Sequence, residues 1–199
     1  MFAIGHFAIG YLTGKASARK LKVQLNMPLL LTASVIPDID LLLGFLLHRG
    51  PTHSLITIIA LTVPFLILYR KNAVPYSIAL VSHSLIGDFF TGGIQLFWPL
   101  STEWYGAINI DVHSLTNSFL ELALFFVSTV VMFKTGDLRK IAQDKYKIAL
   151  LLPFGAVLGP MFAAGRGSEY ALSLLLVIPS LFYLAIFAYS MMVGKFRKR

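Results

Sequence analysis

Long apolar runs separated by short polar stretches dominate this chain. Each run is long enough, or nearly so, to cross a bilayer as a helix, which takes about 20 residues. The runs cover approximately residues 25–47, 54–69, 74–90, 117–133, 148–164 and 170–193. Residues 2–14 are apolar too, but would reach only about 20 Å as a helix, so a short or re-entrant helix is expected there. The pattern predicts an all-α, polytopic membrane bundle of about six transmembrane helices plus a short N-terminal helix, forming one domain over residues 1–199.

Composition supports a membrane environment and limits the available chemistry. Of the 199 residues, 57% are hydrophobic and 13% are charged, whereas soluble domains carry about 25% charged residues. Such a chain must place much of its surface in lipid. Cysteine is absent, so disulfides, thiolate ligands and a cysteine nucleophile are excluded. Any metal ion must be bound by nitrogen and oxygen.

The chain has a net charge of +8, and its basic residues are distributed as the predicted spans would require. Basic clusters at 15–22, 70–71, 134–147 and 195–199 all fall on one side of the alternating spans, and of the 17 Lys and Arg residues only Arg49 and Arg166 fall on the other. The positive-inside rule therefore predicts a multi-pass protein of the inner or plasma membrane, with its basic loops and C-terminus in the cytoplasm. A nucleic-acid partner is not expected, because its binding patch would have to lie on one face.

Histidine and aspartate residues cluster in four short motifs within the first 116 residues. Ionisable groups at membrane depth are costly and usually functional, and His with carboxylate is a ligand set for borderline divalent metals. In the alternating topology all four motifs lie toward the outer face. They predict a divalent metal site there, with zinc the first choice and manganese the second, while residues 117–199 add further membrane helices. The motifs are Gly5-His6, Pro37-Asp38-Ile39-Asp40, His48-Arg49-Gly50-Pro51-Thr52-His53-Ser54 and His83-Ser84-Leu85-Ile86-Gly87-Asp88.

Pro37 is expected to break the 25–47 run, and non-helical backbone at depth is tolerated only inside protein or beside a wet cavity. Asp38 could simply cap the helix that follows, but capping leaves Asp40 unexplained. The two carboxylates would point about 200° apart on a regular helix. We therefore expect one of them, Asp38, to bind the metal and the other to orient a ligand or cap the helix.

His48 and His53 flank a turn made by Gly50 and Pro51. Both are candidate metal ligands, although a wet interfacial loop would also accommodate them. Arg49 beside them suits an anionic phosphate or carboxylate group, or lipid headgroups.

His83 and Asp88 lie five positions apart, which rotates them by about 140° on an α-helix. Gly87 could loosen that helix and bring Asp88 round. Asp111, His113 and Glu121 are weaker candidates. The first two fall in a polar outer loop, and Glu121 near the start of a helix, where a negative charge is favourable.

Together the four motifs resemble the YdjM-like family of membrane-bound metal-dependent hydrolases, over roughly residues 1–100. That family looks distantly similar to zinc-dependent phospholipase C enzymes, in which His and Asp ligands hold zinc ions. The resemblance implies metal roles for His6, Asp38, His53, His83 and Asp88, with His48 and Asp40 close by. The spacing from His83 to Asp88 departs from the four-residue spacing of the family, so the role of Asp88 is less secure.

The predicted function is therefore an integral membrane hydrolase that uses metal-activated water, whose pKa a bound metal lowers to about 7. Asp40 or Asp88 would act as general base and Arg49 would hold the anion of a phosphoester or lipid-like substrate. The expected partners are membrane lipid and a small-molecule or lipid substrate; the oligomeric state stays open. A transporter or ion-coupled channel, or a scaffold with a structural metal, are the alternatives.

Overall fold

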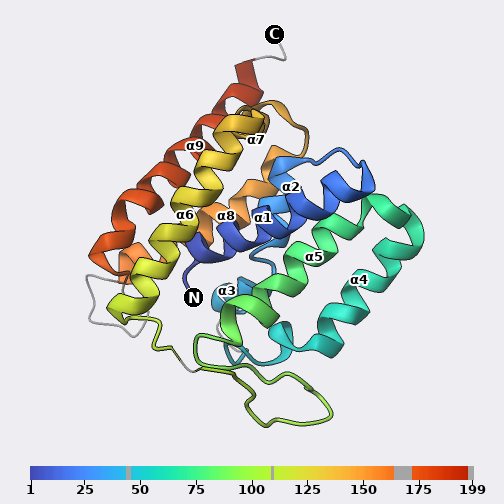
Figure 1. Ribbon diagram of the computed structural model, residues 1–199, viewed down its shortest axis with the longest axis vertical. Coiled ribbons are helices and arrows are strands. Elements are labelled where there is room, and N and C mark those ends of the chain that lie inside the picture. The colour runs from blue at the N-terminus through green and yellow to red at the C-terminus, as the bar shows by residue number, and fades with distance from the viewer. Residues whose placement is uncertain (44–45, 109, 164–171, 197–199) are drawn as a thin grey trace.

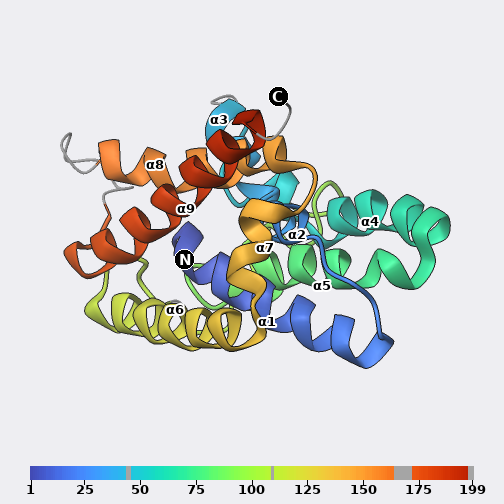
Figure 2. The same cartoon turned by 90° about the horizontal axis from the view of Figure 1, so that it is seen from above.

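The computed structural model describes residues 1–43, 46–108, 110–163 and 172–196. Within these ranges the regular structure is helical, and pairing of β type is limited to an isolated bridge between Ile94 and Tyr105. The all-α prediction is confirmed. A central helix, α1 (Ala3–Leu21), packs against α5 (Val74–Ser82) and α6 (Leu115–Thr135) (Figures 1 and 2).

Helix α1 is longer than the short segment expected at residues 2–14. It continues through the basic cluster and ends at Leu21, where Lys22 adopts a left-handed conformation. Arg19 and Lys20 lie in its last turn, where positive charge is favoured by the helix dipole. The first half of α1 is buried, so this helix is part of the core of the bundle.

The apolar run at 25–47 does not form one helix. It is divided into α2 (Met27–Ala33), the 3-10 turn η1 (Pro37–Ile39) and α3 (Asp40–Leu43). The break falls at Pro37, as predicted, because proline cannot donate the hydrogen bond that a continuous helix needs. Residues 44 and 45, at the end of this run, lie outside the described ranges.

The next two runs form an antiparallel pair. The 3-10 turn η2 (Pro51–His53) precedes α4 (Leu55–Tyr69), and η3 (Arg70–Asn72) connects α4 to α5. Helix α5 passes directly into η4 (His83–Asp88), which is a π-helix. The chain then continues from α6 through α7 (Asp137–Gln143), η5 (Lys147–Leu150), α8 (Leu151–Ala163), η7 (Leu174–Leu176) and α9 (Val177–Phe196).

The expected count of about six spans is not confirmed. By length and composition, 3 described helical stretches could cross a membrane: Leu55–Asn72, Leu115–Thr135 and Leu174–Val193. The pair Asp137–Gln143 and Lys147–Phe162, bent by 109°, would make a fourth. The difference arises because the 25–47 run is broken between Ala33 and Pro37, and because the helical part of the 74–90 run ends at Asp88 and is too short for a span.

The chain passes back and forth between two ends of the molecule (Figure 1). At the lower end in that view lie the N-terminus, α3 and the long loop that follows η4; the turn from α6 to α7 and the end of α9 lie at the upper end. Arg166 and residues 197–199, which belong to the predicted charge pattern, lie outside the described ranges. The predicted motifs therefore gather at the end opposite to the basic α6–α7 turn.

Candidate metal centre

Four buried side chains from separate sequence motifs converge at the lower end of the bundle. Asp38 comes from η1, His53 from η2, His83 from the start of η4 and Asp88 from its end. One ligand atom of each lies within 4.8 Å of the others. Asp38 is 9% exposed and the other three are at most 1% exposed, so this four-residue cluster is closed to bulk water except beside Asp38.

The distances within the cluster match the edges of a metal-binding tetrahedron. The Nε2 atoms of His53 and His83 are 3.1 Å apart, and both lie 3.2 Å from Asp88 Oδ2. Asp38 Oδ1 lies 3.5 Å from the first nitrogen and 3.4 Å from the second. Four ligands bound at about 2.0–2.1 Å to a tetrahedral ion would be separated by about 3.3–3.4 Å. Five of the six donor–donor distances are thus close to those of such an ion, and the sixth, between Asp38 and Asp88, is within 4.8 Å.

The π-helix η4 brings His83 and Asp88 onto the same side. Its wider turn is visible where Phe89 N–H donates to Ser84 O, five residues earlier, at 2.9 Å. On an α-helix the five-residue spacing would have separated the two side chains. Single π turns occur preferentially at functional sites, and the sequence expectation that the helix loosens around Gly87 agrees with this geometry.

Hydrogen bonds behind the two histidines turn their Nε2 atoms toward the cluster. His83 Nδ1 lies 2.7 Å from the carbonyl oxygen of Ser34, which can only accept, so Nδ1 carries the hydrogen. His53 Nδ1 lies 3.0 Å from Thr52 Oγ1 and 3.3 Å from Asp40 Oδ2. Metal-binding histidines usually donate their other ring N–H to a carbonyl or carboxylate in this way.

Asp40 orients the turn that carries His53. Its carboxylate accepts from His48 Nδ1 at 3.1 Å, from the backbone N–H of Arg49 at 3.3 Å and from Thr52 Oγ1 at 2.9 Å. Burial alone would raise the pKa of Asp40, but the hydrogen bonds from His48 and His53 outweigh burial and hold that pKa below its usual range. Asp40 is therefore an ionised positioning group, and its role as general base stays a prediction.

His53 lies among three carboxylates. Burial alone would lower its pKa, but the nearby carboxylates of Asp38, Asp40 and Asp88 outweigh burial and raise the pKa well above its usual value. The same negative surroundings that favour a proton on this ring also favour a divalent cation beside it.

Arg49 faces the cluster through Asp88. Its Nη2 lies 3.0 Å from Asp88 Oδ1, and its Nη1 donates to the carbonyl oxygen of Thr91. The amino group of Met1 donates to the same Asp88 oxygen at 3.2 Å. Arg49 thus fixes a candidate ligand in place, while contact with a substrate anion stays a prediction.

His6 lies at the edge of the cluster and stacks on His83, with ring centroids 3.6 Å apart and planes inclined by 16°. Its Nε2 is 3.6 Å from Asp88 Oδ1. Both ring nitrogens are buried and have no hydrogen-bond partner among the described residues. The structure therefore brings His6 to the cluster predicted for it, while leaving it outside the four closest donors. His48 lies beside the cluster, with its ring edge-on to that of His53 at a centroid distance of 5.2 Å and its Nδ1 against Asp40, and these three residues form a second group that could bind a metal ion.

Of the weaker candidates, Glu121 has an unexpected position. It lies inside α6, fully buried, and accepts from the backbone N–H groups of Phe2 at 2.8 Å and Gly5 at 3.0 Å. It therefore caps the start of α1, the helix that carries His6. The signal for this role was a carboxylate inside an apolar run. His113 packs edge-on against Phe2, with ring centroids 5.7 Å apart, and is not in the cluster.

The donor set fits a divalent metal ion. Two imidazole nitrogens and two carboxylate oxygens suit zinc and related borderline metals. Asp88 Oδ2 is buried and accepts no hydrogen bond within the described part of the chain, so one acceptor points into the cluster without a donor. The chemistry of the cluster thus supports metal binding and leaves the identity of the metal open.

The comparisons with known proteins agree with this picture of a membrane protein. A family model described as YdjM inner membrane protein matches residues 1–197, well beyond the first 100 residues that carry the motifs. No curated protein and no solved structure matches the chain. The chain therefore belongs to the YdjM inner membrane protein family.

Proposed function

We propose that this protein is an integral membrane metal-dependent hydrolase, with its metal centre formed by Asp38, His53, His83 and Asp88. The observation that carries the proposal is the convergence of four buried donors at tetrahedral spacing. A divalent ion bound there would supply Lewis-acid activation of water at neutral pH. Zinc is the first choice, because imidazole nitrogen and carboxylate oxygen are both common zinc ligands and the set has four of them.

The protein's own residues would hold this centre rigid. Ser34 and Asp40 orient His83 and His53 through the ring nitrogens that face away from the cluster. Arg49 holds Asp88 from its other oxygen. A precise arrangement of this kind is what a catalytic centre requires, since misplacement by about 1 Å can cost 100-fold in rate.

A lipid-like phosphoester is the proposed substrate class. Asp38 is the most exposed of the four donors, and the neighbouring side chains Ile39, Leu41 and Leu43 are apolar and exposed. An apolar surface beside the accessible edge of the site suits a substrate that arrives from the bilayer interface. We also propose that this end of the molecule faces outward, because the basic α6–α7 turn lies at the other.

Metal analysis of the detergent-purified protein tests the centre. The wild type should retain close to one zinc or manganese ion per chain, and His53→Ala and Asp38→Ala should lose it. His113→Ala, outside the cluster, is the matched control and should keep the metal. If the wild type is well folded and metal-free, or if both cluster variants keep its metal content, the proposal is wrong.

A scaffold with a structural metal is the second candidate, and one observation favours it. The cluster offers four protein donors, and four protein ligands are typical of structural zinc sites, whereas catalytic sites usually keep one position for water. Hydrolysis of a phospholipid in mixed micelles distinguishes the two candidates. A catalytic centre requires activity that chelation abolishes and added metal restores, whereas a structural centre predicts only a lower unfolding temperature after chelation.

A further inference from the structure

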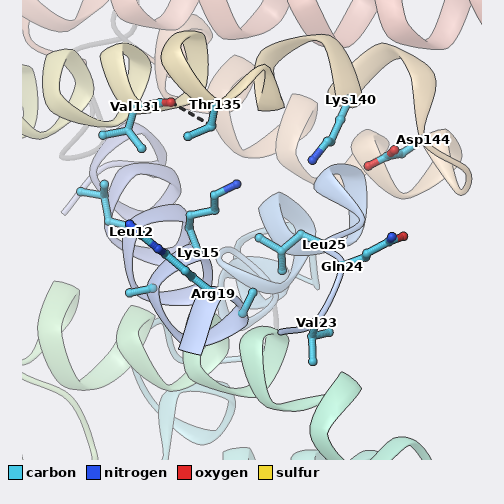
Figure 3. A pocket seen from close by; sticks show the side chains of 12 residues that line it. Leu12, Lys15, Arg19, Val23, Gln24, Leu25, Val131, Thr135, Lys140 and Asp144 are labelled. Carbon is cyan, nitrogen blue, oxygen red and sulfur yellow. Dashed lines mark hydrogen bonds between the residues drawn. The ribbon is translucent and has the colours of Figure 1, made fainter. Parts of the chain in front are cut away.

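A pocket lies far from the metal cluster, between the C-terminal half of α1 and the end of α6 with α7 (Figure 3). Its volume is about 770 Å³. Figure 3 shows side chains of α1 and of the α6–α7 segment facing each other across it. The pocket is lined by both cationic and apolar side chains. Its wall includes Leu12, Lys15, Ala16, Arg19, Leu25, Val131, Lys140 and Asp144.

The carboxylates near the pocket already have partners. Asp137, fully buried beside it, accepts from the amino groups of Lys15 and Lys140, the latter at 2.8 Å, and from Tyr11 and Thr135 at 3.0 and 2.7 Å. Asp144 Oδ2 accepts from the backbone N–H of Met27 at 2.8 Å. These acids are thus committed to holding α1, α2 and α7 together.

Arg19 is a cation of the pocket wall that forms no ion pair with either of these carboxylates. Within the described residues it has no carboxylate partner, and its side chain is exposed on the wall of the pocket. A guanidinium offers forked donors that match the oxygens of a phosphate. Lys15 on the same wall and Lys140 on the one opposite share the single carboxylate of Asp137, so these three groups leave one net positive charge beside Arg19.

The apolar part of the wall limits the choice of ligand. Leu12, Leu25 and Val131 lie beside the cations, so an occupant should carry both a negative headgroup and an apolar tail. The helix dipole by itself explains basic residues at the end of α1, but it accounts for neither a cavity nor an apolar wall beside them. Basic pockets between helices at the cytoplasmic surface are typical sites for anionic lipid headgroups.

We propose that this pocket binds the phosphate headgroup of an anionic phospholipid, with Arg19 as its main contact and the acyl chains along Leu12 and Val131. The site is separate from the metal centre. It would tie α1, which carries His6, and α7 to the surface of the membrane.

Lipid retention on the intact protein tests the proposal. The wild type, Arg19→Gln, Lys20→Gln and Ala16→Phe would be placed in nanodiscs of phosphatidylcholine and phosphatidylglycerol at a ratio of 4:1. Each would then be re-extracted, and the lipids that remain bound would be counted by native mass spectrometry. Lys20 is adjacent to Arg19 on α1 and is not among the residues that line the pocket, so Lys20→Gln is the matched control. Ala16→Phe fills the pocket without a change of charge.

We expect the wild type to retain phosphatidylglycerol selectively and Arg19→Gln to lower that retention about fivefold, the effect of about 1 kcal/mol per basic residue. Ala16→Phe should abolish retention, and Lys20→Gln should leave it unchanged. An unaltered thermal unfolding profile would confirm that the variants fold. Equal losses in Arg19→Gln and Lys20→Gln would overturn the proposal, since they would show attraction to the surface only. Displacement of the lipid by millimolar inorganic phosphate would also overturn it, in favour of a soluble ligand.

Discussion

Gly87 leaves the space that the imidazole of His6 occupies. A Cβ atom at Gly87 would lie 2.4 Å from His6 Cε1 and 2.6 Å from Nδ1, closer than any packing tolerates. We expect Gly87→Ala to displace His6 from its stack on His83 and to lower the free energy of unfolding by about 1–3 kcal/mol, the usual cost of overpacking. Thermal unfolding and metal content of the purified variant would measure both effects.

The matched control is Gly155→Ala in α8. No atom of the described residues lies within 4 Å of a Cβ placed at Gly155, so this variant should be neutral or slightly stabilising, as alanine is favoured over glycine inside a helix by about 1 kcal/mol. Equal behaviour of the two variants would show that the contact between Gly87 and His6 is unimportant.

Asp40 and Asp38 lie two positions apart but have different places in the centre. Asp38 directs an oxygen at both Nε2 atoms, whereas Asp40 contacts the opposite side of His53. We expect Asp40→Asn to weaken metal binding by about 10–100-fold, as is typical of groups that orient ligands, and Asp38→Asn to weaken it further. Competition with a chromophoric chelator would give both affinities. An Asp40→Asn protein with the affinity of the wild type would contradict the orienting role.

The residues of the centre could be predicted from sequence more readily than their geometry. Costly ionisable groups in an apolar chain identified Asp38, His53, His83 and Asp88 as candidates, and the structure brings them together. The relation of His83 to Asp88 could not be derived, because α-helical periodicity was assumed where the backbone forms a π-helix. In the π-helix Gly87 packs directly against His6, a residue distant in sequence. A local sequence pattern carries no information on such a tertiary contact.

At the scale of the element, the start of α1 depends on a partner in α6. The carboxylate of Glu121 accepts two backbone N–H groups of the first turn and a hydrogen from Asn117 Nδ2 at 2.8 Å. We expect Glu121→Ala to leave buried donors without an acceptor and to lower the free energy of unfolding by about 1–3 kcal/mol per donor. Because α1 carries His6, protease sensitivity near the N-terminus should rise as well.

Glu103→Ala provides the control for that variant, since Glu103 is exposed in the loop after η4 and bonds to Tyr105. Denaturation in a mild detergent, followed by tryptophan fluorescence, would compare the two. If Glu121→Ala unfolds at the same denaturant concentration as Glu103→Ala, capping of α1 by Glu121 contributes nothing to stability.

The elements themselves were predictable where composition decides them. Pro37 breaks its run because proline lacks an N–H group, and this needs no tertiary information. The extension of α1 to Leu21 did not follow from hydropathy, because its second half is basic, with Lys15 bound to Asp137. Hydropathy measures transfer into lipid, and it does not register a cationic side chain that is bound by a buried carboxylate from another element.

At the scale of the whole molecule, the two ends differ in charge and chemistry, and this difference predicts an orientation. The metal-centre end would face outward and the basic end the cytoplasm. The chain has no cysteine, so an introduced cysteine is the only thiol in a variant, and its labelling reports on the end of the molecule where it lies. Thr102 and Lys71 are exposed and lie in the loop after η4 and in the α4–α5 turn.

We expect Thr102→Cys to react with a membrane-impermeant maleimide in intact spheroplasts, because its loop belongs to the outward end. Lys71→Cys should react only after the membrane is permeabilised. Lys145→Cys, which replaces a residue of the loop between α7 and η5, should behave like Lys71→Cys, because both positions belong to basic clusters that the positive-inside rule assigns to the cytoplasm. Reaction of Thr102→Cys only after permeabilisation, with the other two open from outside, would place the metal centre on the cytoplasmic side. A substrate would then have to reach it from the inner leaflet.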